Sequence, residues 1–184
     1  MESQQKPRPI RPEYDRHGVN GFYRQSGSSY RNPHEPIIGN LIAQAISQWP
    51  LDLSNVLDVA CGSGEVTLAL RRAAPGSKIT GMDPFTHGAY EERTGETAEG
   101  ISFEEIAVGS LAGRDYSLVV CSFALHLLPV SRLPTLLYEL TRISGDLLIL
   151  TPHKRPIIKA EQGWRLKGEI LEDRVRARHY TRIR

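Results

Sequence analysis

The stretch that decides the fold is residues 55–64, which read Asn-Val-Leu-Asp-Val-Ala-Cys-Gly-Ser-Gly. It opens with a short apolar run rich in β-branched residues, which is typical of a buried strand. Gly62-Ser63-Gly64 then predicts a turn in which the backbone can approach a ligand closely, because glycine has no Cβ. Apolar residues recur at helical spacing directly afterwards. A strand, a glycine turn and a helix in this order begin a nucleotide-binding α/β unit.

A second strand is predicted at 78–83, and it ends in a carboxylate, Asp83, nineteen residues after Gly64. Acids at this point of nucleotide-binding units accept hydrogen bonds from ribose hydroxyls. A dinucleotide site would need a third glycine, and Thr67 occupies its place, which disfavours an NAD-dependent oxidoreductase. The structural alternative is that Gly62 and Gly64 serve only a tight turn and that Asp83 caps a loop.

The form Val-Leu-Asp-Val-Ala-Cys-Gly-Ser-Gly resembles the first motif of class I S-adenosylmethionine-dependent methyltransferases, and the resemblance extends over residues 36–184. It implies S-adenosylmethionine as the cofactor and an acceptor that the sequence does not identify. The implied cofactor-binding residues are Asp58, Gly62 and Gly64 at the methionine half, Asp83 at the ribose, Pro84 or Phe85 at the adenine, and Ser122 near the methyl group. The acid that the family often uses for the adenine is missing from residues 106–109, so backbone groups would have to serve.

His126 is the best candidate for a general base, because it follows a strand at the carboxyl edge where ligands of such sheets bind. A helix-start histidine bonded to backbone is an equally good interpretation. His153 could line the acceptor site, although an ordinary loop role explains it as well. No metal is expected. A cofactor-binding partner subunit without catalytic activity is the main alternative function.

The remaining pattern predicts an α/β protein with a Rossmann-like, mostly parallel, seven-stranded sheet. The predicted strands are 55–60, 78–83, 101–106, 116–122 and 146–151, followed by a C-terminal pair. Helices are predicted from Asn32-Pro33-His34-Glu35 to about Trp49, over 65–74 and over 133–143, with at most a short one in 88–99. Asn32 would cap the first of these helices, and Glu35 would complete a capping box.

The end of the chain breaks the alternation of strands and helices. Residues 152–163 contain two prolines and are too short for a full crossover helix, so that helix is predicted to be reduced or missing. Two alternating strands follow, with Glu172-Asp173 as their turn, and predict an antiparallel hairpin with one dry and one solvated face. Trp164, Leu166, Gly168 and Ile170 would share the dry face of the first strand. The second strand gathers Arg174, Arg176, Arg178, Tyr180, Arg182 and Arg184 on its solvated face.

Charge is unevenly distributed along the chain. Residues 51–150 hold seven Lys and Arg against thirteen Asp and Glu, whereas residues 151–184 hold ten against four, a net charge of +6. If the crossover helix is missing, the basic face of the hairpin is open. It then either serves only as a solvated surface or binds an acidic partner, which could be RNA or a protein.

The 184 residues suit one domain, and 40% hydrophobic residues are ordinary for a globular protein. Residues 1–13 read as a disordered leader, and residues 14–184 as a single domain in which 14–35 could form a lid containing Tyr23, Tyr30 and His34. Cys61 and Cys121 are expected to be small core residues in a reducing compartment. No apolar run is long enough for a membrane span, and no secretory signal is evident, so a cytoplasmic or nuclear location is expected.

Overall fold

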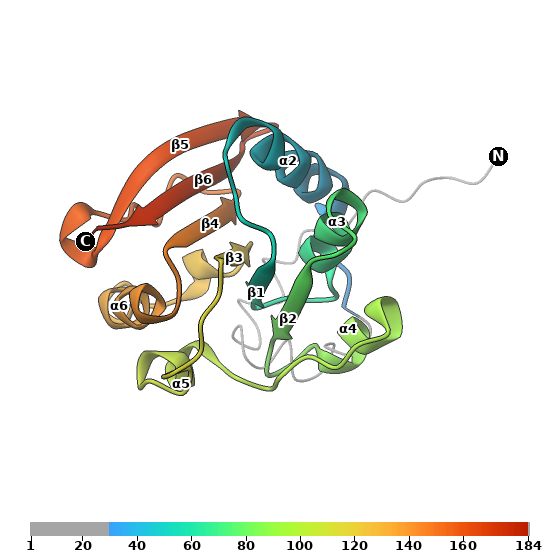
Figure 1. Cartoon of the computed structure of the whole chain (residues 1–184), viewed down its shortest axis with the longest axis horizontal. Helices are drawn as coiled ribbons and strands as arrows, with labels where there is room; N and C mark the ends of the chain where they lie inside the picture. Colours follow the sequence, from blue (N-terminus) through green and yellow to red (C-terminus); the bar gives the residue numbers. More distant parts are fainter. Residues whose placement is uncertain (1–29, 184) are drawn as a thin grey trace, which may run out of the picture.

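The computed structural model describes residues 30–183. The predicted leader, most of the predicted lid segment including Tyr23, and Arg184 lie outside the described residues. Within them, one six-stranded sheet runs through the molecule in the order β2-β1-β3-β4-β6-β5 (Figure 1). The strands are β1 (Asn55–Val59), β2 (Lys78–Met82), β3 (Leu118–Ser122), β4 (Asp146–Thr151), β5 (Trp164–Glu172) and β6 (Val175–Arg182).

Helices cover both faces of this sheet. They are α2 (Glu35–Gln48), α3 (Glu65–Ala73), α4 (His87–Thr94), α5 (Phe103–Ala107) and α6 (Leu133–Ile143), with short 3₁₀ turns at Leu125–Leu127 and Ala160–Gln162. Side chains of α2 and α3 form one apolar core with the sheet, and those of α5 and α6 form another on the opposite face (Figure 1). The predicted α/β architecture is therefore confirmed.

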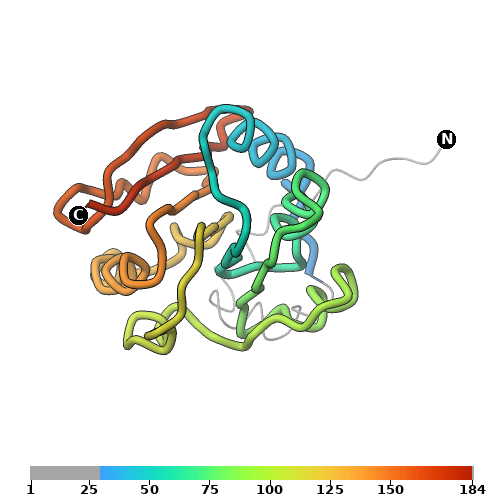
Figure 2. The backbone as a smooth tube through the Cα atoms, in the orientation of Figure 1, coloured from blue at the N-terminus to red at the C-terminus, as the bar shows by residue number. Residues whose placement is uncertain are grey.

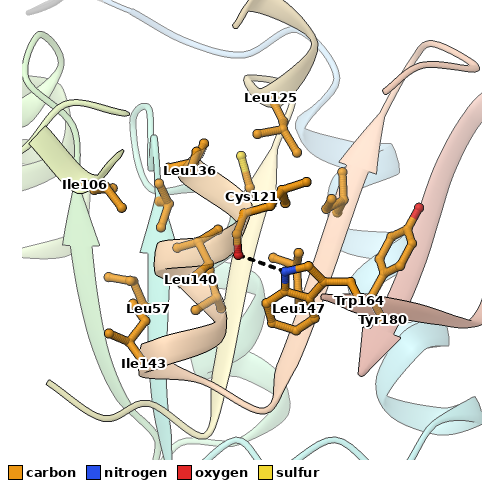
Figure 3. Close-up of a cluster of buried hydrophobic side chains, with 14 of the residues drawn as sticks. Leu57, Ile106, Cys121, Leu125, Leu136, Leu140, Ile143, Leu147, Trp164 and Tyr180 are labelled. Carbon is orange, nitrogen blue, oxygen red and sulfur yellow. Dashed lines mark hydrogen bonds between the residues drawn. The ribbon is translucent and has the colours of Figure 1, made fainter. Parts of the chain in front are cut away.

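Strands β2, β1, β3 and β4 are parallel, and β6 and β5 complete the sheet in antiparallel pairing. Strands covered on both faces need apolar side chains on both, which explains the near-continuous apolar runs of β1, β3 and β4. Trp164 lies at the centre of the core under α6, where its indole N–H donates to the backbone oxygen of Leu137 at 3.0 Å (Figure 3). The strands predicted at 116–122 and 146–151 and the helix predicted at 133–143 are close to those observed.

The strand predicted at 101–106 is wrong, so the sheet has six strands rather than seven. A helix, α5, stands there instead, and Ser102 begins it with a capping box in which the backbone N–H of Glu105 is bonded to the Ser102 hydroxyl. The reciprocal bond runs from the Ser102 backbone N–H to the Glu105 carboxylate at 2.8 Å. The only extended pairing in this region is one parallel bridge between Met82 and Glu99. The apolar pattern of residues 101–106 is too short to distinguish a strand from a helix, and the capping box favours the helix.

The first helix also begins later than predicted. Asn32 does not cap α2 but accepts a hydrogen bond from the His34 backbone N–H at 2.9 Å, which closes a turn before the helix. Glu35 does not complete a capping box, because its carboxylate is paired with Arg93 on α4. The start of α2 is thus fixed by a contact between distant segments, which the sequence pattern did not contain.

No full crossover helix connects β4 to β5, as predicted (Figure 2). Residues 152–163 cross the sheet end with a single 3₁₀ turn, and Ile158 from this segment is buried in the core under α6. The hairpin turn lies at Asp173 and Arg174, one residue later than predicted. Both have positive φ, 45° and 67°, as two-residue hairpin turns require.

The predicted arrangement of side chains on β5 is wrong. Leu166 pairs with Tyr180, whereas Gly168 pairs with His179, so Lys167 is an extra residue in a β-bulge. The bulge reverses the alternation along the strand. Trp164 therefore packs in the core under α6, and Ile170 packs in the core under α2 on the other face.

The predicted solvated face of β6 is also wrong in part. Tyr180 and Arg178 are buried, with 2% and 7% of their surfaces exposed. The Arg178 guanidinium donates to the Glu169 carboxylate at 2.6 Å and to the Pro156 backbone oxygen at 3.0 Å. The segment that replaces the crossover helix therefore covers β6, and the hairpin has no continuous wet face.

Candidate functional site

The predicted site residues come from the carboxyl ends of neighbouring strands, which meet at one edge of the sheet because β1 to β4 are parallel. Asp58 lies near the end of β1 and the glycine turn follows that strand, whereas Asp83 follows β2. Ser122 is the last residue of β3, and His126 lies in the 3₁₀ turn after it. Four of the buried polar atoms without a hydrogen-bond partner among residues 30–183 lie here: Asp58 Oδ1, Thr86 Oγ1, Ser122 Oγ and His126 Nδ1. Such a concentration is typical of a site that receives polar ligand groups.

The glycine turn has the backbone that the sequence predicts. Gly62 and Gly64 have positive φ, 57° and 86°, so a side chain at either position would be strained. A Cβ on Gly64 would stand 2.5 Å from the Thr94 side chain and 3.3 Å from the Tyr90 ring. A Cβ on Gly62 would stand 3.2 Å from the Tyr30 ring. The turn is therefore closely packed against the protein's own side chains as well as being conformationally restricted.

Asp58 is the most buried acid of the site, with none of its surface exposed. Its Oδ2 accepts a hydrogen bond from the Thr67 hydroxyl at 2.8 Å, while Oδ1 has no partner among the described residues. Burial, with smaller contributions from the neighbouring carboxylates of Glu65 and Asp83, raises the pKa of Asp58 to about 7 against the lowering effect of the Thr67 hydrogen bond. A cationic group near Oδ1 would relieve both effects.

Thr67, which replaces the third glycine of a dinucleotide site, holds Asp58 in place. Its hydroxyl lies 3.1 Å from the Tyr90 hydroxyl, and since its own proton goes to Asp58, Tyr90 must donate to it. Tyr90 has no exposed surface and packs so closely on Gly81 that a Cβ there would stand 2.6 Å from its ring. A chain of hydrogen bonds thus joins α4, α3 and β1 beneath the turn.

The Asp83 carboxylate is buried, and most of its hydrogen bonds come from backbone N–H groups. Its Oδ1 accepts from the N–H groups of Phe85 and Thr86 at 2.8 and 3.1 Å. Its Oδ2 receives only a long contact, 3.4 Å, from the Gly62 N–H. Burial raises the pKa of the Asp83 carboxyl against the lowering effect of these hydrogen bonds. The second oxygen therefore keeps capacity for further donors. Pro84 and Phe85, which follow directly, are half-buried at the same edge.

The first residues that the structure describes lie across this site. The Asn32 backbone N–H donates to the Glu65 carboxylate at 3.0 Å, at the start of α3. Arg93 of α4 contacts Glu35, Glu65 and the backbone oxygen of Ser63, the last at 3.2 Å. These contacts fasten the segment before α2 to the glycine turn. Tyr30 and His34, two of the three residues of the hypothesised lid, accordingly lie at the site.

The end of β3 has an unusual backbone. Phe123 has a φ of 55°, a conformation that costs a residue with a side chain on the order of 1–3 kcal/mol. Its ring stacks on His34 with 4.9 Å between centroids and 20° between planes. Ser122, just before it, buries a hydroxyl oxygen without a partner among the described residues. The strained turn thus brings polar and aromatic groups to the edge beside Asp58.

His126 lies in the 3₁₀ turn after β3 and contacts His153, which follows β4. The ring centroids are 4.5 Å apart, at an angle of 57°. Burial, together with the neighbouring His153, lowers the pKa of His126 to about 4, so its ring is neutral near pH 7. The structure therefore brings together two histidines that the sequence placed separately, and leaves His126 Nδ1 unpartnered.

The comparisons with known proteins agree with this geometry. Residues 56–145 match the family described as a methyltransferase domain. A Schizosaccharomyces pombe protein described as uncharacterized is 34% identical over 199 residues, 86% of this chain and 80% of that protein. Magnesium protoporphyrin IX methyltransferase from Synechocystis PCC 6803, solved with bound SAM, has a TM-score of 0.62 at 16% identity, over 98% of this chain and all of that one. An O-methyltransferase family protein from Burkholderia thailandensis has a TM-score of 0.63 at 15% identity, over 97% of this chain and 65% of that one.

This chain is a class I S-adenosylmethionine-dependent methyltransferase family member. The resemblance noted in the sequence is confirmed, and S-adenosylmethionine is confirmed as the cofactor of the family to which the methyltransferase domain belongs. Which residues hold it in this chain stays a prediction that the geometry described above supports.

Sequence reasoning missed several residues of this methyltransferase site. Thr67 was noted only as a missing glycine, and the residues of α4 that reach the site, Tyr90 and Arg93, gave no signal in a polar stretch. Glu65 was detectable, because an acid in the first turn of a helix that follows a glycine turn is well placed to bond backbone N–H groups. Cys61 and Cys121 are buried free thiols, as expected.

Two further observations apply to residues 30–183 as a whole. No group of three or more His, Cys, Asp or Glu side chains in residues 30–183 is arranged to hold a metal ion. None of the helices in the same part of the chain combines the length and the apolar character that crossing a membrane requires.

Proposed function

We propose that this chain transfers the methyl group of S-adenosylmethionine to an acceptor at the carboxyl ends of β3 and β4, with His126 taking the acceptor's proton. The observation that carries the proposal is the set of unpartnered polar atoms at this edge, Asp58 Oδ1, Ser122 Oγ and His126 Nδ1. Asp58 lies on β1, Ser122 ends the neighbouring parallel strand β3, and His126 lies in the turn that follows β3, so one ligand and its neighbour can meet all three.

The residues present fit the cofactor. Asp58 and Asp83 place two buried carboxylates beside the glycine turn, which suits a cation with ribose hydroxyls. Asp83 Oδ2 is the oxygen with capacity for a hydroxyl donor. Pro84 and Phe85 stand where the adenine is expected, and Ser122 where the methyl group is expected. No acid lies in residues 106–109, so backbone groups would bind the adenine.

S-adenosylmethionine, when bound, supplies a methyl group on a sulfonium that is already activated. The protein then has to align the acceptor and exclude water. The aromatic pair of Phe123 and His34 stands beside the edge and shields it from solvent. Tyr30, against Gly62, shields the other side. These groups fit a lid role for the segment before α2.

His126 would take the proton that the acceptor loses and pass it on. Burial and the neighbouring His153 lower its pKa to about 4, so the ring is neutral near pH 7 and can accept a proton. The same low pKa means that the ring releases this proton readily instead of keeping it. His153, in ring contact with it, lies nearer the solvent and can relay the proton outward. A base is needed only for acceptors that keep their proton at neutral pH.

The two alternatives have less support. An NAD-dependent oxidoreductase would need the third glycine, and here Thr67 fills that place with a hydroxyl bonded to Asp58. A cofactor-binding subunit without activity would not need a strained β3 end that carries His126 towards the edge. The comparisons favour neither of them.

The test is transfer of labelled methyl from S-adenosylmethionine by the purified chain in native cell extract. Products are separated into RNA, protein and small-molecule fractions. We expect label in one fraction, and a loss of about a hundredfold in its rate with His126→Gln while cofactor binding is kept. Binding with no transfer in any fraction would support the non-catalytic subunit, and equal transfer by His126→Gln would remove the base.

A further inference from the structure

Arg93 of α4 joins three separate parts of the molecule through one guanidinium. Its Nη2 donates to the Glu35 carboxylate at 2.5 Å, at the start of α2. Its Nη1 faces the glycine turn, 3.2 Å from the backbone oxygen of Ser63 and 3.5 Å from the Glu65 carboxylate. The side chain is 15% exposed. A planar guanidinium suits this place, because it can donate to several acceptors in fixed directions at once.

Glu65 brings residue 32 into the same network. Its Oε1 accepts hydrogen bonds from the Asn32 backbone N–H at 3.0 Å and from the Ser63 hydroxyl at 2.5 Å. Arg93 approaches the same oxygen, so Glu35 and Glu65 share one cation. Because Glu65 is buried, removing that cation would leave its charge uncompensated, and the contacts that it makes should weaken together.

Residues 30–34, which we name the strap, lie over the place where the cofactor is expected. At one end, the Tyr30 ring is 3.2 Å from the position that a Cβ on Gly62 would take, so it fills the space beside the glycine turn. At the other end, the His34 ring stacks on Phe123 after β3. The strap thus reaches from the turn expected at the methionine half to the strand end expected at the methyl group. A ligand that approaches Gly62 from this side has to displace Tyr30.

The strap is held differently from the helix that follows it. Four side chains fix α2 in the apolar core that it forms with α3 and the sheet: Ile38, Leu41, Ile42 and Ala45. The strap, by contrast, is attached through polar and ring contacts, and the pair of Glu35 with Arg93 fixes its junction with α2. The first turn of α2 has no side-chain cap hydrogen bond to hold that junction. The strap can therefore open without opening the core.

We infer that Arg93 is a positioning residue that holds the strap closed over the bound cofactor, so that breaking its pair with Glu35 sets how fast the cofactor enters and leaves. Arg93 acts through Glu35 and Glu65 and does not have to touch the cofactor itself. The inference rests on the proposed function for the place of the cofactor, and it adds a residue of α4 that controls cofactor exchange. A closed strap slows release, so a weakened one should raise the dissociation rate.

Arg71 of α3 provides a matched control. It is also a partly buried arginine, and it ties α3 to the end of α4 through the Glu96 carboxylate and the Thr94 backbone oxygen, the latter at 2.8 Å. Neither contact involves the strap or residues 62–64. Arg71→Gln removes the same charge from the same region, so it should lower stability without changing cofactor exchange.

The first test is the dissociation of labelled S-adenosylmethionine from the full chain. Excess unlabelled cofactor is added to the complex, and the loss of label from the protein is followed by rapid filtration. We expect Arg93→Gln and Glu35→Gln each to speed dissociation at least tenfold, and Arg71→Gln to stay within twofold. Free energies of unfolding are measured for all three variants. If Arg93→Gln does not fold, Glu35→Gln, at a side chain 32% exposed, carries the test.

The two changes should act as one. The double variant, Arg93→Gln with Glu35→Gln, should dissociate within twofold of Arg93→Gln alone. Effects that multiply would mean that the pair does not act as a unit, and they would overturn the inference, as would parent rates in the folded single variants. A parent chain that binds no label at all would refute the proposed function, and the inference with it.

Trypsin cleavage after Arg31, an exposed residue of the strap, reports closure directly. Peptides that begin at Asn32 are measured by mass spectrometry, without cofactor and with saturating S-adenosylmethionine. We expect the cofactor to slow this cleavage at least tenfold in the parent chain and in Arg71→Gln, but less than threefold in Arg93→Gln. Equal protection in the parent chain and Arg93→Gln, or no protection in the parent chain, would overturn the inference.

Discussion

The first α/β unit and the terminal hairpin both form as their sequences predict, yet only in the first do the side chains lie where the sequence places them. In the unit β1–α3–β2, the glycine turn, Asp58 and Asp83 all stand where the pattern places them. In the hairpin, the bulge at Lys167 reverses which side chains of β5 face each side of the sheet, and residues 156–158 cover β6. Features that residues adjacent in sequence determine can be predicted from the sequence. The side of a strand that becomes buried depends on which distant segments pack against it, and this cannot be predicted in the same way.

The largest effect should follow from Gly64→Val, which tests the first unit. The valine would have a strained backbone and a Cβ against Thr94 and Tyr90. We expect S-adenosylmethionine affinity to fall by at least about a hundredfold in calorimetry. Gly76→Val is the control, because nothing lies within 4 Å of a Cβ there. Wild-type affinity in Gly64→Val would mean that the turn is not the binding loop.

Asp83→Ala should weaken cofactor binding by about 1.5–3 kcal/mol, the usual value of a hydrogen bond to an ionised group. The change also leaves the N–H groups of Phe85 and Thr86 without their acceptor, so stability is measured in parallel. Asp83→Asn keeps an acceptor for these groups and isolates the charge. If a folded Asp83→Ala binds as tightly as the parent chain, the ribose assignment fails.

Gly168→Ala tests the hairpin, and here stability should change while cofactor affinity does not. A Cβ on Gly168 would stand 2.7 Å from the Trp49 indole nitrogen, so either the ring or β5 must shift. We expect unfolding to become easier by about 1–3 kcal/mol in a denaturant titration while cofactor affinity is kept. Gly145→Ala, where a Cβ meets nothing within 4 Å, should be close to neutral. A loss of cofactor binding in Gly168→Ala would mean that the two regions are coupled.

The smallest effect concerns the proton on Asp58. Because burial raises its folded pKa to about 7 from 3.8, its contribution to stability is greatest below pH 3.8 and is lost as pH rises to about 7. A cationic cofactor favours the ionised form, so affinity should rise about fivefold between pH 5.5 and 7.5. Asp58→Asn should flatten this dependence. A parent chain whose affinity is constant over that range would contradict the placement of Asp58 beneath the cofactor.

A feature could be predicted from the sequence when residues close together along the chain determine it. The glycine turn, its two acids and the parallel strands are features of this kind, and they were found. The helix at 103–107 was missed because five residues are too few for a period, and Ser102 with Glu105 decides the structure by capping. Tyr90 and Arg93 were missed because their partners, Thr67 and Glu35, lie 23 and 58 residues away in sequence.

The bulge at Lys167 also bears on how this chain can diverge. Deleting that residue would restore simple alternation, but it would turn either Trp164 or Ile170 from a core towards solvent. Substitutions along the exposed positions of β5 carry no such penalty. Among descendants of this chain, the length of this strand should therefore vary less than its surface composition, and an insertion here should be accepted only with a second, compensating one.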